Sequence, residues 1–160
     1  MKRQRGFTLI EILVVIAILA ILLAITIVAI NPARQFGQAN DTKRRSDTTA
    51  LLNAIDQYSA SNAGSLPTDI TTMATGSAIT LNNTNFPTLC SQLVTTYISA
   101  LPVDPSATGN TSPNSTSGIT SCATVPWNTA YTISKDSSSR ITVGAPNAFS
   151  GILKGTWSWM

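Results

Sequence analysis

One acidic residue, Glu11, stands inside an apolar run that otherwise has the composition of a membrane segment. A carboxylate costs about 2.5 to 3.5 kcal/mol at mid-span on insertion scales and less near the end of a span, so an acid at such a position is a candidate for function. The alternative is that Glu11 lies among the lipid headgroups and has no role. The chemistry available to it is charge pairing with a cation that is equally costly to leave alone in an apolar setting.

The other candidates for chemistry are the two cysteines, Cys90 and Cys122. We expect them to form a disulfide, which in the chain-entropy model contributes roughly 3 to 4 kcal/mol to a small domain. Two free buried thiols are the alternative. Two cysteines in a chain without histidine are too few soft ligands for a metal site, and histidine-based acid–base catalysis is excluded. We therefore predict no metal and no other cofactor.

The apolar run from Phe7 to Ile30 predicts a membrane-spanning helix, because 21 of its 24 residues are apolar. A helix of that length measures about 36 Å, enough to cross a hydrocarbon core of about 30 Å. A buried helix of a soluble core is disfavoured, since the rest of the chain is too polar to surround it. A secretory signal peptide is also disfavoured, because the run is long and no small-x-small cleavage site precedes Asn31.

The basic character of the chain is local. Lys2, Arg3 and Arg5 carry the whole net charge of +3, since the other seven Lys and Arg are balanced by seven Asp and Glu. Nucleic acid is therefore a possible partner without support from the charge pattern. Basic residues flank both ends of the span, but the Ser/Thr-rich region that holds the cysteines suits an oxidising space. We expect a single-pass protein of the cytoplasmic membrane with a cytoplasmic N-terminus.

The segment before the span is basic and ends in glycine (KRQRG), and the span opens with FTLIE. This pattern resembles the leader of the type IV pilin and pseudopilin family. The resemblance implies that a prepilin peptidase cuts between Gly6 and Phe7, that the same enzyme N-methylates Phe7, and that Glu11 pairs with the new N-terminal amine. Many members carry a proline at the position of Val28. Here Pro32 follows four residues later, which predicts a helix kink near residues 28–32.

Together the patterns and the resemblance predict an α+β pilin fold. A long N-terminal helix spans the membrane with its first half, and a small C-terminal head contains a second helix and a short antiparallel sheet. We expect residues 1–6 to be a cleaved leader and residues 7–30 to be the transmembrane or filament-core helix. Residues 31–64 would continue this helix in amphipathic form, and residues 65–160 would form an extracytoplasmic head.

The amphipathic part of the long helix is predicted to end at Asn62–Gly64, where Gly64 supplies a C-cap. Its charge run Lys43-Arg44-Arg45 is expected to form a solvated face, with subunit-to-subunit ion pairing or weak DNA capture as the alternative. Four residues of this part are expected to pack against the head, namely Leu51, Leu52, Ile55 and Tyr58.

In the head, apolar residues at helical spacing predict a second helix from Asn85 to Leu101, whose stripe would lie in the core. Residues 106–121 have the composition of a long exposed loop. Thr129–Ser134 and Arg140–Gly144 are predicted to form a hairpin, and Ile152–Met160 a third strand.

These features and the family resemblance together imply a structural subunit of a type IV pilus rather than an enzyme, and the resemblance implies adhesion, twitching motility or DNA uptake as the role of the filament. Its partners would be the prepilin peptidase, the membrane, further copies of itself in a helical filament at the cell surface, and the assembly machinery. The alternative is a pseudopilin of a type II secretion system, which is favoured by the string Leu101–Pro105. A membrane-tethered enzyme or binding domain is a distant alternative, since no GxSxG elbow, P-loop or paired carboxylates are present.

Overall fold

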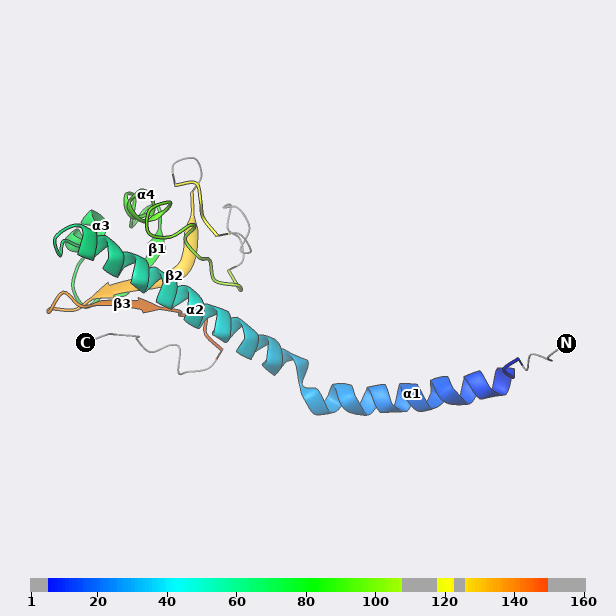
Figure 1. Cartoon of the computed structure of the whole chain (residues 1–160). Helices are drawn as coiled ribbons and strands as arrows, with labels where there is room; N and C mark the ends of the chain where they lie inside the picture. The colour runs from blue at the N-terminus through cyan, green and yellow to red at the C-terminus, as the bar shows by residue number, and fades with distance from the viewer. Residues whose placement is uncertain (1–5, 108–117, 123–125, 150–160) are drawn as a thin grey trace. The chain divides into compact units, whose positions relative to one another are not determined.

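The computed structural model describes residues 6–107, 118–122 and 126–149 (Figure 1). The chain divides into two units, Met1–Phe36 and Gly37–Met160. The elements, in order, are α1 (Leu9–Ile30), α2 (Pro32–Ser61), α3 (Thr68–Thr72), β1 (Ile79–Asn82), α4 (Leu89–Leu93), β2 (Asn128–Lys135) and β3 (Ile141–Gly144). A long apolar N-terminal helix, further helices and a small antiparallel sheet form the α+β, pilin-like arrangement that the sequence predicts.

Helix α1 is apolar on all sides. The segment Leu9–Ala29 is long and apolar enough to cross a membrane, and none of it is buried. The helix ends at Asn31, which adopts the left-handed conformation with φ 45° and ψ 78°. Pro32 then begins α2, because proline cannot donate to the helix before it and suits a first helical position. The side-chain oxygen of Asn31 accepts from the backbone N of Arg34 at 3.3 Å.

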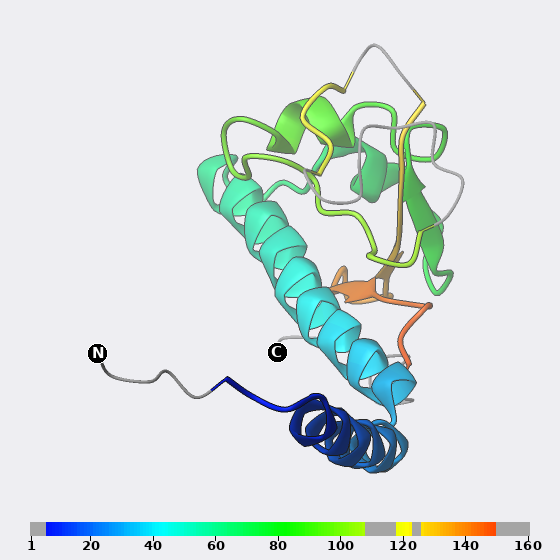
Figure 2. The ribbon, with the colours of Figure 1, turned by 90° about the vertical axis from the view of Figure 1, so that its right-hand side faces the viewer.

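Helix α2 carries the apolar stripe that closes the core of the second unit. Its buried apolar residues are Leu51, Leu52, Ala54 and Ile55, while Tyr58 is partly buried against Tyr97. The helix ends at Ser61, close to the predicted stop. Ala63 and Gly64 have φ of 52° and 83°, and the N–H of Gly64 donates to the carbonyl of Ser59 at 2.9 Å. The sheet and the short helices all lie to one side of α2 (Figure 2).

The sheet has three antiparallel strands in the order β1-β2-β3. The predicted hairpin is present, with Lys135 opposite Ile141 and Ile133 opposite Val143. The third strand is β1, which the sequence analysis did not predict and which pairs with the other edge of β2. The strand expected over Ile152–Met160 lies outside the described residues. Burial alternates along β2, with Thr129, Tyr131, Ile133 and Lys135 facing inward.

The predicted second helix over Asn85–Leu101 is wrong in length, because α4 has only five residues. Val94 is extended and Thr95 has φ of 76°, so the helix stops there. Residues 94–96 are β-branched, and such side chains lose rotamer freedom in a helix. The predicted burial of the stripe is confirmed for Leu89, Cys90, Leu93, Val94 and Leu101.

The segment predicted as an exposed loop, residues 106–121, contains a buried anchor. Ile119 is fully buried and forms an antiparallel bridge with Leu101, with N–H···O distances of 2.8 and 3.0 Å. Gly118 has φ of 71°, and a Cβ there would lie 2.9 Å from the Leu101 carbonyl oxygen. The one large apolar residue of this polar stretch, Ile119, therefore fixes its end on the core. Residues 108–117 lie outside the described part.

Candidate functional site

The first candidate site is the start of α1, where Glu11 and Thr8 form a capping box. The backbone N and the hydroxyl of Thr8 both donate to Oε2 of Glu11 at 2.8 Å. In return the backbone N of Glu11 donates to the Thr8 hydroxyl oxygen at 3.3 Å. These bonds satisfy donors that a helix N-terminus leaves unpaired. They also hold the carboxylate beside the backbone of the residue that follows Phe7.

The predicted cleavage site lies immediately before this box, in chain that is not helical. Residues 6–8 precede α1, and Gly6, Phe7 and Thr8 are exposed. A Cβ built on Gly6 meets no atom within 4 Å, and its φ lies outside the left-handed region. None of the described residues therefore requires glycine at position 6.

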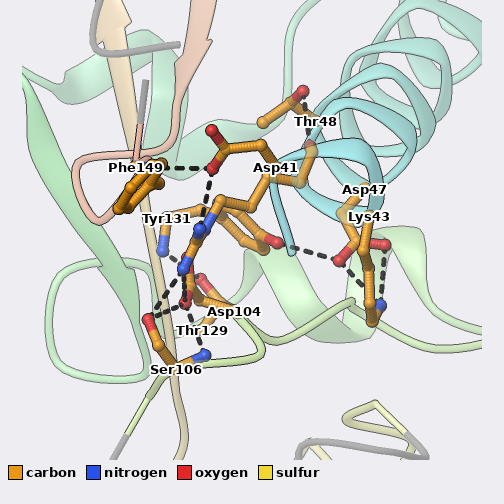
Figure 3. A network of polar contacts seen from close by, with 10 residues as sticks. Asp41, Lys43, Asp47, Thr48, Asp104, Ser106, Thr129, Tyr131 and Phe149 are labelled. Carbon is orange, nitrogen blue, oxygen red and sulfur yellow. Dashed lines mark hydrogen bonds and ion pairs between the residues drawn. The ribbon is translucent and has the colours of Figure 1, made fainter. Parts of the chain in front are cut away.

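The second candidate site is a buried polar network between α2 and the rest of the globular unit (Figure 3). Arg44 lies at its centre and is 2% exposed. Its Nε and Nη2 donate to the two carboxylate oxygens of Asp104 at 2.7 and 3.0 Å, and Nη1 donates to Asp41 at 2.9 Å. Nη2 also donates to the Ser106 hydroxyl at 2.7 Å. The guanidinium of Arg44 is bound by two carboxylates, and one of them belongs to Asp104, sixty positions further along the chain.

The expectation that Lys43-Arg44-Arg45 forms a solvated face is therefore wrong for Arg44. The reason is helical geometry: Asp41, Arg44 and Thr48 are spaced three and four residues apart, on the face that continues to Leu51 and Ile55. The polar residues extend the buried stripe toward the start of α2. The absence of apolar residues in this stretch hides the periodicity, which charged and hydroxyl side chains carry instead.

A second branch of the network runs through Asp47. The hydroxyl of Tyr131 donates to Asp47 Oδ2 at 2.8 Å, and Lys43 Nζ approaches both oxygens at 2.8 and 3.0 Å. Tyr131 is fully buried at the centre of β2. Burial, followed by the hydrogen bond to Asp47, raises the pKa of the Tyr131 hydroxyl. It stays a neutral donor, so α2 is joined to the central strand by a hydrogen bond to a charged acceptor.

Arg44 and Asp104 each stabilise the charged form of the other. Burial alone would raise the pKa of Asp104, but the hydrogen bonds from Arg44 and Ser106 outweigh it and hold that pKa below its usual range. The hydrogen bond to Asp104 correspondingly raises the pKa of Arg44. Removing one partner from such a pair leaves an uncompensated buried charge, which typically costs about 3 to 5 kcal/mol. The network therefore makes the attachment of α2 to the head sensitive to single substitutions.

The cysteines are joined, with Sγ atoms 2.07 Å apart and Cα atoms 5.5 Å apart. This disulfide links α4 to the segment that follows Ile119. Among the residues that the structure describes, no group of three or more His, Cys, Asp or Glu could hold a metal ion. The described part of the chain thus contains a capped helix start, a disulfide and a buried ion network.

Comparison with known proteins extends the description of the N-terminus. Residues 1–27 match the family model of the prokaryotic N-terminal methylation motif. The type II secretion system core protein G of Klebsiella pneumoniae is 41% identical over 63 residues, which are 39% of this chain and 44% of that protein. The core protein G of Aeromonas hydrophila is 41% identical over 61 residues, which are 38% of this chain and 41% of that protein.

The chain therefore spans less than half the length of the curated relatives it matches. No solved structure matches it. The methylation motif and the two relatives confirm the resemblance of the N-terminal part of the chain to the type IV pilin and pseudopilin family.

Proposed function

We propose that this protein is a structural subunit of the pseudopilus of a type II secretion system. The observation that carries the proposal is an apolar helix, α1, that begins within a methylation motif matched over residues 1–27 and is exposed over Leu9–Ala29. The sequence pattern alone predicts a type IV pilus subunit, with the secretion pseudopilin as its alternative. Relatives named as type II secretion core proteins favour the alternative, so the order is reversed. A pilus subunit remains the second candidate, because the leader pattern is common to both.

The proposed work of α1 is to hold the subunit in the cytoplasmic membrane and then to pack in the core of a filament. An all-round apolar helix can exchange lipid for neighbouring helices at little hydrophobic cost. A head-to-tail contact that does not close on itself then propagates as an open helical filament. The role is structural rather than catalytic, as expected from the family. Self-association, the membrane and the assembly machinery are its proposed partners.

The proposed maturation step is removal of residues 1–6 by a prepilin peptidase and methylation of Phe7. Cleavage removes Lys2, Arg3 and Arg5 and leaves side-chain charges that sum to zero. The new amine then lies one residue before Thr8, whose backbone N binds Glu11. Pairing of this amine with Glu11 of the same or a neighbouring chain lowers the cost of both charges in an apolar filament core.

We propose the domain limits that follow from this pathway. Residues 7–30 form the span or filament core, residues 31–64 the stem, and residues 65–160 a head outside the cytoplasm. The disulfide supports an oxidising compartment for the head. After assembly the head would lie on the outside of the filament.

Two measurements test the proposal in the host. Intact-mass analysis should show the chain without residues 1–6 and with one added methyl group, and Gly6→Val should retain the leader although the fold leaves room for the side chain. Wild-type protein that keeps its leader would contradict the processing step. Deletion of the gene should reduce secretion of extracellular enzymes and leave surface pili intact. Loss of pili with normal secretion would select the pilus candidate.

A further inference from the structure

Phe149 is an exception among the apolar side chains of the unit that begins at Gly37. In the described part of this unit every other large aliphatic or aromatic hydrophobe is buried or half-buried, whereas Phe149 is 61% exposed. A scattered exposed hydrophobe is normal on a protein surface. Phe149 differs because the structure fixes its position from two sides.

The backbone N of Phe149 donates to Oδ1 of Asp41 at 2.9 Å, and Asp41 is held in turn by Arg44 (Figure 3). The ring covers Gly37, so that a Cβ at Gly37 would lie 2.7 Å from the ring's Cγ. A glycine inside a helix is less favourable than alanine, so its presence calls for a reason. Here it opens the surface of α2 to the ring, which is held in place while most of it stays exposed.

Chain length places this ring near a membrane whenever α1 spans one. The apolar segment ends at Ala29, and the eight residues from there to Gly37 rise about 12 Å in helical chain. The headgroup layer adds about 5 to 8 Å on each side of the hydrocarbon core. Gly37 thus lies no more than about 12 Å beyond the hydrocarbon core. Gly37 and the ring over it lie within the headgroup layer when α2 runs obliquely, and about 4 to 7 Å outside it when α2 runs along the membrane normal.

The chemistry of this surface suits that layer. Phenylalanine is one of the residues that interfacial helices place in the boundary between headgroups and acyl chains. An exposed aromatic ring held this close to the end of the span fits the surface of a phospholipid bilayer.

We propose that Phe149 and the surface of α2 around Gly37 form a contact with the phospholipid headgroup layer while the subunit is anchored in the membrane. The contact limits the orientations of the head before assembly. This inference rests on the membrane-anchored stage of the proposed function, and it adds a second lipid contact that the span itself does not provide.

The test uses the full-length protein in vesicles of phosphatidylcholine and phosphatidylglycerol. Asn147→Cys carries an environment-sensitive dye two residues from the ring, and both native cysteines are occupied by the disulfide. Spin labels on the lipid headgroups should quench this dye at least twofold, and Phe149→Ala should abolish the quenching without lowering the melting temperature. The control dye at Ser138→Cys, exposed in the turn between β2 and β3, should stay unquenched.

A dye at Ile18→Cys separates the two possible failures. If lipid-borne quenchers in the acyl region do not reach it, the span is not inserted and the proposed anchoring fails. If they do reach it while Asn147 reports water, the anchoring stands and the headgroup contact is wrong. Quenching at Asn147 that survives Phe149→Ala would assign the contact to another segment and overturn the inference. If the fluorescence of the Asn147 dye changes with the number of protein molecules per vesicle and not with the lipid quencher, the dye contacts another copy of the chain. That result also overturns the inference.

Discussion

Asp104 binds the guanidinium of Arg44 through both of its oxygens, at 2.7 and 3.0 Å, and thereby connects the segment after Leu101 to the middle of α2. Both side chains are buried, and Asp41 binds the same guanidinium from one helical turn away. Asp41, Arg44 and Asp47 of the charged stretch are therefore part of the interior of the globular unit, whereas Lys43 and Arg45 are exposed. The ion network around Arg44 attaches α2 to the rest of the globular unit, as the buried side chains of Leu51 and Ile55 do further along the helix.

The first prediction concerns the stability of this network. Arg44→Met leaves the carboxylates of Asp41 and Asp104 buried without their cation, so it should lower the free energy of unfolding by about 3 to 5 kcal/mol. Asp104→Asn should cost less, because Arg44 keeps Asp41. Denaturant unfolding of the full chain in detergent measures both.

Arg45→Met is the matched control, since Arg45 is the next residue and is exposed. Surface substitutions of this kind usually change stability by less than about 0.5 kcal/mol. Equal effects at positions 44 and 45 would mean that the buried pair does not hold α2 in the head.

The second prediction concerns the pH dependence of stability. In the wild type the folded pKa of Asp104 is depressed, so its contribution is present above the unfolded value of about 3.9 and is lost as the pH falls through the lower folded pKa. In Arg44→Met, burial acts without the guanidinium and raises the folded pKa of Asp104. Acidification toward that raised value should then stabilise the variant.

Unfolding free energies between pH 7 and pH 3 decide this point. The gap between wild type and Arg44→Met should narrow as the pH falls, because the variant gains stability where its buried carboxyl groups take up protons. Asp104→Asn in the Arg44→Met background should reduce this narrowing. A gap that is constant over the whole range would show that uncompensated charge is not the cause of the loss.

The third prediction concerns the disulfide, which closes a chain separation of 32 residues. Cys90→Ser should lower stability by roughly 3 to 4 kcal/mol and make the thiol of Cys122 available for titration. Ser91→Ala, at an exposed neighbour, should have little effect. Two titratable thiols in the wild-type protein purified without reductant would contradict the observed pairing.

The sequence predicts those parts of the molecule that local pattern decides. Composition alone identifies α1, Gly64 marks the end of α2, and the turn before Arg140 predicts the hairpin. The Arg44–Asp104 pair lacks a local signal, because tertiary packing brings its partners together over sixty residues. The predicted second helix is too long because apolar spacing reports burial: the chain turns at the exposed Thr95, yet Leu93, Val94 and Leu101 stay buried as they would in a helix.

The last prediction separates two roles of Glu11. One is to cap the start of α1 together with Thr8, and the other is to pair with the amine of Phe7. Glu11→Val removes the cap and the charge, and it should strengthen membrane retention while reducing filament assembly. Thr8→Ala removes the cap's hydroxyl but keeps the charge, so it should assemble if pairing with the Phe7 amine is the function of Glu11. Glu11→Gln keeps an oxygen that can accept from Thr8 and removes only the charge. It should therefore assemble poorly although its helix start is intact, because an amine without its counter-ion in an apolar filament core costs several kcal/mol. Sheared filament yield at equal membrane levels measures all three variants. If Glu11→Gln gives the wild-type yield of filament while Thr8→Ala gives less, the function of Glu11 is to cap the helix and not to pair with the amine.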